Sequence, residues 1–300
     1  MIAVLSFGGI KAQDEYSCED SYIIYNSALT AKDYPRAYAF WHNIVSGSCD
    51  DVIKEKQHLV INNADLVMGK LMKGVDAAKK RKLIDSTYFA YNKGKELGVW
   101  TPKQKEGLAR AYAKYDTKTK FQEVHDLLNE VINEAPGKMK SSSYKYYFQS
   151  CILLFKEGKM DKGGIVTEYL RLTPICKKNM EAASSDKKKK QWQGAIDFML
   201  QNAKPFLTCE IITEIYKPKV EADPKNQELL DEAFGLLSGA KCEGNDVSVD
   251  FYLVVLNNML ENAPTAKGYF GKGNLEIAKG KKKEADASFE KAFELVGDDA

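Results

Sequence analysis

The sequence has few of the residue patterns that build metal sites and phosphate-binding loops. It contains only three histidines: His42, His58 and His125. None of them has a second histidine, or a cysteine pair, at the spacing of a zinc site. The glycines at 158, 163 and 164 flank a predicted helical turn and follow no strand, so they do not form a phosphate-cradling loop, and no nucleophile elbow occurs. We therefore expect no metal, no cofactor and no catalytic residue.

Neither sign of charge is in excess. Lysines and arginines number 44 and acidic residues 42, so the net charge does not point to a nucleic acid or an anionic membrane as partner. We interpret three lysine-rich runs as solvated surface, because each lies at a predicted helix end or turn near acidic residues: 79–82, 187–190 and 281–283. Beyond the first residues, no apolar run approaches the roughly 18 residues that a membrane-spanning helix requires. We expect no nucleic acid partner and no transmembrane segment.

Apolar residues recur at intervals of three and four, as in Val124, Leu127, Leu128 and Val131, which predicts amphipathic helices. Alternating strand patterns joined by Asn-Gly or Asp-Gly turns do not occur, so we expect an all-α fold. The predicted helices are 17–31, 34–47, 51–72, 76–97, 102–115, 118–134, 141–157, 161–180, 187–203, 207–221, 226–239, 247–262, 266–279 and 282–296.

Helix-breaking prolines divide these helices into hairpins. Pro136, Pro224 and Pro264 each follow a predicted helix, and a proline cannot continue a helix interior because it lacks the amide proton. Consecutive helices then pair into hairpins of roughly 34 to 45 residues, the repeat length of helical solenoids.

Seven residues of the last predicted hairpin have a repeat-like order and spacing: Tyr269, Gly273, Asn274, Gly280, Ala285, Phe289 and Ala292. They resemble a tetratricopeptide repeat (TPR), and we expect its two helices to pack closest where the small residues Gly273 and Ala285 face each other. A weaker copy places Ala37 and Trp41 at the corresponding four-residue interval. The resemblance covers most of residues 14–300 and implies a right-handed superhelical solenoid of antiparallel helix hairpins.

The first thirteen residues read as an apolar run followed by Lys-Ala-Gln. This segment, 1–13, resembles a secretory signal peptide, and its Ala-Gln end is similar to export signals of the Bacteroidetes. No basic residue precedes the apolar run, as in a signal peptide that has lost its start. We expect an exported protein, periplasmic or extracellular, whose domain spans residues 14–300. The alternative is a buried or frayed N-terminal segment.

The six cysteines test this expectation, because an exported chain can form disulfides. In an antiparallel hairpin, residues equidistant from the turn lie opposite each other. By this rule Cys18 and Cys49 are offset by roughly 3 Å, and Cys209 and Cys242 by roughly 4 to 5 Å, so both pairs can be bridged.

The remaining two cysteines, Cys151 and Cys176, are offset by roughly 12 Å and are predicted to be free, buried thiols. The alternative is that all six cysteines are reduced and simply fill the core.

In TPR proteins the first helix of each hairpin lines a concave surface that binds peptides or protein elements. The resemblance therefore implies four candidate partner-binding residues in the last hairpin: Lys267, Phe270, Asn274 and Ile277. The alternative for Phe270 and Ile277 is contact with the preceding repeat.

The leading interpretation is a non-enzymatic scaffold of the bacterial cell envelope that binds a protein or peptide. A second is a glycan- or nutrient-binding accessory protein of an outer-membrane uptake system, which predicts exposed aromatic residues on the concave face. The densest aromatic cluster is Tyr144, Tyr146, Tyr147 and Phe148, and the alternative for it is that aromatics so close together on one helix divide between core and surface. A third is a helical-toroid hydrolase, which would need acidic residues from distant repeats to converge.

Overall fold

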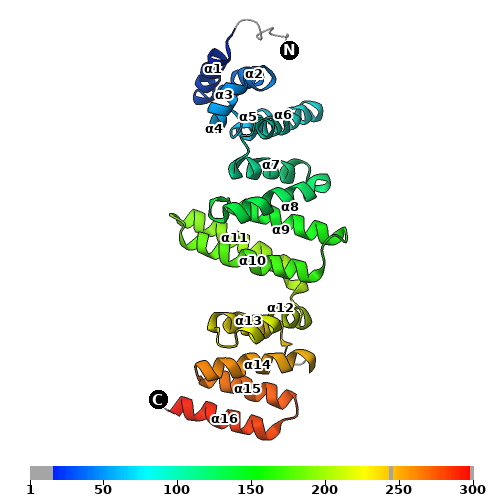
Figure 1. Cartoon of the computed structure of the whole chain (residues 1–300), viewed down its shortest axis with the longest axis vertical. Helices are drawn as coiled ribbons and strands as arrows, with labels where there is room; N and C mark the ends of the chain where they lie inside the picture. The colour runs from blue at the N-terminus through cyan, green and yellow to red at the C-terminus, as the bar shows by residue number, and fades with distance from the viewer. Residues whose placement is uncertain (1–15, 243–245, 298–300) are drawn as a thin grey trace. The chain divides into compact units, whose positions relative to one another are not determined.

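The computed structural model describes residues 16–242 and 246–297, and within these ranges the chain forms helices and no strand (Figure 1). The all-α prediction is confirmed, whereas the predicted signal peptide, 1–13, lies outside the described residues. The α-helices are α1 (Cys18–Thr30), α2 (Tyr34–Ser46), α3 (Asp50–Glu55), α4 (Gln57–Val60), α5 (Ala64–Leu71), α6 (Ala77–Glu96), α7 (Pro102–Tyr115), α8 (Thr117–Glu134), α9 (Ser141–Lys156), α10 (Lys162–Glu181), α11 (Asp186–Ala203), α12 (Cys209–Ala222), α13 (Gln227–Gly239), α14 (Asp246–Asn262), α15 (Ala266–Ala278) and α16 (Lys282–Gly297).

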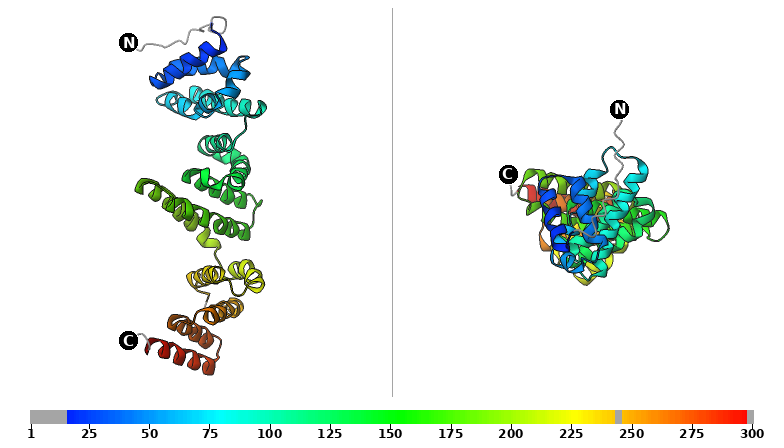
Figure 2. Two further views of the ribbon diagram at one scale, coloured as in Figure 1. Left: turned by 60° about the vertical axis from the view of Figure 1, so that its left-hand side comes forward. Right: turned by 90° about the horizontal axis from the view of Figure 1, so that it is seen from above.

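The helices fall into two compact units. Unit 1 comprises the chain up to Leu154 together with Glu181–Ala195, and unit 2 comprises Phe155–Met180 and the chain from Ile196 onwards. In unit 1, α1 packs on α2, α5 on α6, and α7 on α8; in unit 2, α13 packs on α14 and α15 on α16. Figures 1 and 2 both show α15 and α16 running side by side. Each of these pairs is one of the predicted hairpins, so the fold is TPR-like.

Local capping explains where the hairpin helices begin. The Asp33 side chain accepts a hydrogen bond from the backbone N–H of Arg36, and Pro35 occupies the first turn of α2. Thr101 and Gln104 form a capping box at the start of α7. Side-chain acceptors at these positions satisfy backbone donors that have no partner within the helix.

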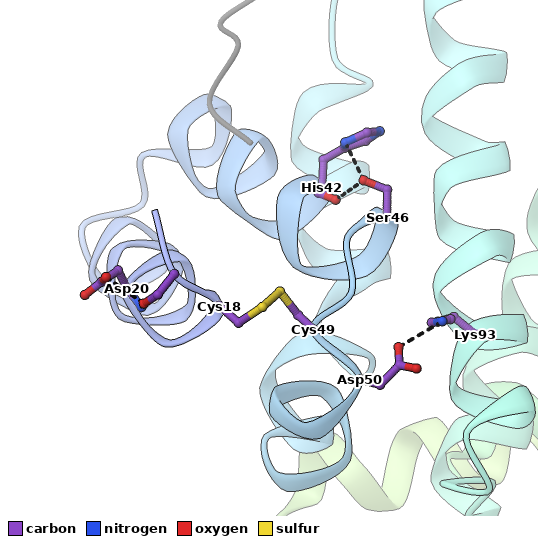
Figure 3. Close-up of a disulfide and its surroundings, with 8 residues drawn as sticks. Cys18, Asp20, His42, Ser46, Cys49, Asp50 and Lys93 are labelled. Carbon is purple, nitrogen blue, oxygen red and sulfur yellow. Dashed lines mark hydrogen bonds and ion pairs between the residues drawn. A yellow bond between two sulfur atoms is a disulfide. The ribbon is translucent and has the colours of Figure 1, made fainter. Parts of the chain in front are cut away.

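Disulfides join the two cysteine pairs that the hairpin spacing selects. Cys18 at the start of α1 is bonded to Cys49 just after α2, with the two Cα atoms 5.4 Å apart (Figure 3). Cys209 at the start of α12 is bonded to Cys242 beyond α13, with the Cα atoms 5.5 Å apart. The first disulfide closes the open end of the α1–α2 hairpin, and the second joins the consecutive helices α12 and α13, which also pack on each other.

The predicted helix 51–72 is wrong, because the structure breaks it into α3, α4 and α5. The Trp41 indole donates a hydrogen bond to the carbonyl oxygen of Val60 at 2.8 Å, and the Tyr25 hydroxyl donates to that of Leu59 at 2.9 Å. Side chains of the first hairpin thereby satisfy backbone acceptors at the break. The apolar spacing does not reveal the interruption, since Val60 and Ile61 are fully buried whether or not the helix continues.

The expected close approach of Gly273 to Ala285 stays a prediction, and the structure identifies another close neighbour of Gly273. A Cβ atom added to Gly273 would lie 2.6 Å from Cε1 of Phe289, and the three nearest neighbouring atoms all belong to that ring. Ala285, which also belongs to α16, is fully buried. Gly273 therefore makes room for the aromatic ring of Phe289, so that the smallest residue of one helix faces a large residue of the other.

Candidate functional site

The four candidate residues of the last hairpin lie on α15. This helix begins after Thr265, whose hydroxyl accepts a hydrogen bond from the backbone N–H of Gly268 at 3.1 Å. It ends before Gly280, whose φ of 72° is the left-handed conformation that glycine adopts most readily. Both ends of α15 are thus fixed by local sequence.

Lys267, Phe270, Asn274 and Ile277 share one face of α15, because their spacing of three, four and three residues follows the helical repeat. Phe270 and Ile277 each keep 54% of their surface accessible, so contact with the preceding repeat does not bury them. The Phe270 ring instead lies 5.4 Å from the Phe289 ring of α16, centroid to centroid. We call these four residues the α15 face.

A groove of about 220 Å³ adjoins the α15 face within unit 2. Its apolar lining comes mainly from α14, and α13 contributes a wall on which Asp231 and Phe234 lie. Lys267 belongs both to the groove and to the α15 face, so the two form one continuous surface. The lining residues are Gln227, Asp231, Phe234, Leu256, Met259, Leu260, Ala263, Thr265, Lys267 and Gly268.

Opposite charges are available at this groove. The Asp231 carboxylate accepts a hydrogen bond of 2.8 Å from the Gln227 side-chain amide, and the Gln227 carbonyl accepts one from Asn262 at 3.3 Å. Lys267 has no ion pair among residues 16–242 and 246–297. The groove therefore combines an apolar lining with one ordered acid and one uncommitted cation, which suits an amphipathic ligand.

Sequence reasoning missed the α13 wall of the groove. Gln227, Asp231 and Phe234 are spaced by four and three residues, so a shared helical face was readable from the sequence. That this face lies near Lys267 was not readable, because the contact depends on how α13, α14 and α15 pack.

The aromatic cluster of α9 is largely part of the core. Tyr144, Tyr147 and Phe148 are fully buried, and only Tyr146 is partly accessible. The Tyr144 hydroxyl donates to the carbonyl oxygen of Pro136 at 2.5 Å. The exposed aromatic surface that a glycan-binding protein would present is thus not found at this cluster.

Two of the three histidines, His42 and His125, have partners nearby. His42 is hydrogen-bonded to Ser46 of the same helix (Figure 3). His125 lies 3.1 Å from the Asp126 carboxylate and 3.3 Å from the Tyr147 hydroxyl. The described part of the chain contains no group of three or more histidine, cysteine or acidic side chains that could hold a metal ion.

The two remaining cysteines are buried and do not form a disulfide. Burial raises the pKa of the Cys176 thiol to about 12, so this group stays protonated and unreactive near neutral pH. Among the described residues, no helix is both long and apolar enough to cross a membrane.

No protein-family model and no curated protein sequence matches this chain. A solved structure described as MamA MSR-1 C2 is similar over 84% of this chain and 98% of its own, with 14% identity and a TM-score of 0.25. A second, TTC0263, a thermophilic TPR protein of Thermus thermophilus, is similar over 79% of this chain and 92% of its own, with 13% identity and a TM-score of 0.23. Residue roles therefore follow from this chain's own geometry, which is all-α and TPR-like.

Proposed function

We propose that this chain is a non-enzymatic scaffold that binds an extended segment of a partner protein on the α15 face and its groove. The observation that carries the proposal is the half-exposed state of two large apolar side chains, Phe270 and Ile277, beside an apolar groove. Large exposed apolar side chains that adjoin a groove are typical of interaction surfaces.

The size of the groove favours a polypeptide side chain over a whole small molecule. Pockets for drug-sized ligands span about 300–1,000 Å³, whereas this groove measures about 220 Å³. One apolar side chain of a partner would fill the groove, and burying it would contribute about 1.5–3 kcal/mol. Phe270 and Ile277 would then cover neighbouring residues of the same segment.

We further propose that the protein is exported and acts in a bacterial cell envelope, with the Bacteroidetes as its source. The two disulfides support export, since such bonds persist in oxidising compartments and are rare in the cytosol. Fractionation of the source cells, with mass mapping of the non-reduced protein, tests this proposal. Recovery in the cytosolic fraction with all six thiols reduced would exclude it.

Pull-down from an envelope extract tests the binding role. The full chain, the double variant Phe270→Ser/Ile277→Ser and the control Phe293→Ser are compared as baits. Phe293 of α16 is 73% exposed and is not part of the proposed surface. Its replacement by serine therefore removes an exposed aromatic side chain, as Phe270→Ser does, but at a different site. We expect partners that are retained by the full chain and by the control and are lost with the double variant. Equal recovery by all three baits would contradict the proposed surface.

A further inference from the structure

Two helices of unit 1, α9 and α11, begin side by side. The Tyr144 ring of α9 lies 5.5 Å from the Trp192 ring of α11, centroid to centroid. One residue further along α9, the Nζ atom of Lys145 would lie 3.3 Å from a Cβ atom added to Gly194 of α11. Both contacts advance in the same direction along the two helices. The helices therefore run parallel, and their first turns are neighbours.

Lysines gather at this pair of helix starts. Four of them follow Asp186 in the first turn of α11, and two flank Met139 directly before α9. Lys145 joins them, because Gly194, beside its ammonium group, lies one helical turn beyond Lys190 on the same face. Lys145 is partly exposed and the other six are exposed. We call these residues the lysine patch: Lys138, Lys140, Lys145, Lys187, Lys188, Lys189 and Lys190.

The fold does not neutralise the lysine patch. None of its seven members forms an ion pair with a residue in 16–242 or 246–297. Two exposed acids, Glu181 and Asp186, lie at the same end, one at the close of α10 and one at the start of α11. Seven lysines against these two acids leave a net charge of +5.

Other acids of the neighbouring hairpin already have partners. The buried Glu106 carboxylate accepts a hydrogen bond from the backbone N–H of Lys140 at 2.9 Å and one from the Ser143 hydroxyl at 2.5 Å, so it caps the first turn of α9. Glu130 and Glu134 both pair with Lys105, at 2.9 and 2.6 Å. These acids are therefore engaged in holding the fold.

The two other lysine runs of the chain have acids close by. In the run 79–82, Arg81 donates hydrogen bonds to Asp85 and Asp116, both at 2.9 Å. The run 281–283 is followed at once by Glu284 and Asp286. The lysine patch differs, because lysines from a second helix add to its run where acids follow the others.

We propose that the lysine patch docks the protein on a membrane surface that contains anionic phospholipids. Clusters of about four to eight basic residues on an amphipathic helix are typical of such docking, and each lysine near the headgroups raises the partition coefficient about fivefold. Lysine suits this ligand, because an ammonium group binds phosphate as a point charge and does not need the fixed geometry of an arginine fork.

A nucleic acid is the other polyanion that a cationic surface could bind, and the composition of the patch favours lipid. Proteins read base edges mainly with arginine forks, and they bind single strands with exposed aromatic rings. The patch consists of lysines, and the aromatic pair between its two helices, Tyr144 and Trp192, is buried. A duplex held through its phosphates alone remains to be compared, and the experiment includes one.

This inference does not rest on the proposed binding of a partner protein. The α15 face belongs to unit 2 and the lysine patch to unit 1. The probe is a lipid vesicle and the test variants change lysines of unit 1, so failure of one proposal is distinguishable from failure of the other.

Vesicle flotation with the full chain measures the partition coefficient. The vesicles consist of phosphatidylcholine alone, or of phosphatidylcholine and phosphatidylglycerol in equal parts. One variant changes the α11 run, Lys188→Gln/Lys189→Gln/Lys190→Gln, and a second changes the lysines of α9, Lys138→Gln/Lys140→Gln/Lys145→Gln. The control is Lys281→Gln/Lys282→Gln/Lys283→Gln. It removes the same three charges, also from a helix start, but in unit 2.

We expect the parent to bind the mixed vesicles and not those of phosphatidylcholine alone. Each of the two test variants should lower the partition coefficient at least about tenfold, and the control should leave it unchanged. Binding should be lost in 1 M salt, because the Debye length falls from about 10 Å at 0.1 M to about 3 Å. The Tm of the α11 variant should equal or exceed that of the parent, since lysines are unfavourable at a helix start.

Four results would overturn the proposal. Equal partition into both kinds of vesicle would show that anionic lipid is not recognised, and equal weakening by the control would show that only the net charge matters. Unchanged binding by the α9 variant would show that the two helices do not form one surface. Binding to a duplex oligonucleotide that is tighter than binding to the mixed vesicles, at equal phosphate concentration, would assign the patch to a nucleic acid.

Discussion

Replacing Gly273 by alanine should destabilise unit 2, whereas Gly271→Ala on the same helix should stabilise it. Both changes remove a glycine from a helix interior, which is worth about 0.5–1 kcal/mol. At Gly271 the nearest atom to an added methyl group is Cδ1 of Leu256, 3.9 Å away, which is ordinary contact. At Gly273 the methyl group would lie 2.6 Å from Cε1 of Phe289. Overpacking of this kind costs about 1–3 kcal/mol.

The difference between the two variants isolates the steric term, because the gain in helix propensity cancels. Gly273→Ala should therefore be less stable than Gly271→Ala by about 1–3 kcal/mol. This corresponds to a difference in Tm of about 2–4 °C per kcal/mol for a unit of this size. Urea and thermal unfolding followed by circular dichroism measure it. Equal stability of the two variants would show that Phe289 moves aside at no cost, and the account of this hairpin would fail.

Three further predictions concern the rest of the chain. Changing both Cys18 and Cys49 to alanine should lower the free energy of unfolding of unit 1 by about 3.7 kcal/mol, the chain-entropy value for cysteines separated by 31 residues. Adding a reductant to this variant should then cause no further loss of stability in unit 1. An unfolding midpoint equal to that of the parent would contradict the disulfide. Trp41→Phe should lower the free energy of unfolding by about 1–3 kcal/mol, because the buried carbonyl of Val60 loses its hydrogen-bond donor. A free energy of unfolding in urea equal to that of the parent would refute this explanation of the helix break. Burial raises the pKa of the Asp116 carboxyl, but hydrogen bonds from Tyr88 and Arg81 outweigh that effect and lower its pKa overall. The stabilising contribution of Asp116 is therefore present above the unfolded pKa of about 3.9 and is lost as the pH falls through the folded pKa. Asp116→Asn should thus be less stable than the parent near neutral pH and approach it in acid; an equal difference at both pH values would contradict the assignment.

Helix boundaries were readable from the sequence because local chemistry sets them. The predicted helices 102–115 and 34–47 match α7 and α2 to within one residue, since Pro102 and Pro35 mark their first turns. The cysteine pairing followed from the same local rule, because distances from a turn determine which residues of a hairpin lie opposite each other.

Features that depend on contacts between hairpins were not readable. The break between α3 and α5 depends on donors from Tyr25 and Trp41, which lie far away in the sequence. The capping of α9 by Glu106 likewise depends on a residue one hairpin earlier in the chain. The four residues of the α15 face were identifiable because they belong to a single helix, whereas the groove beside them required three.

Selection from a displayed library of random peptides tests the central claim most directly. The full chain is the target, and the affinities of the enriched peptides are then measured for the parent, for Phe270→Ser/Ile277→Ser and for Phe293→Ser. We predict peptides with an apolar anchor whose affinity falls at least about tenfold with the double variant and is unchanged with the control. Peptides that bind all three proteins equally, or no enrichment above background, would contradict the account.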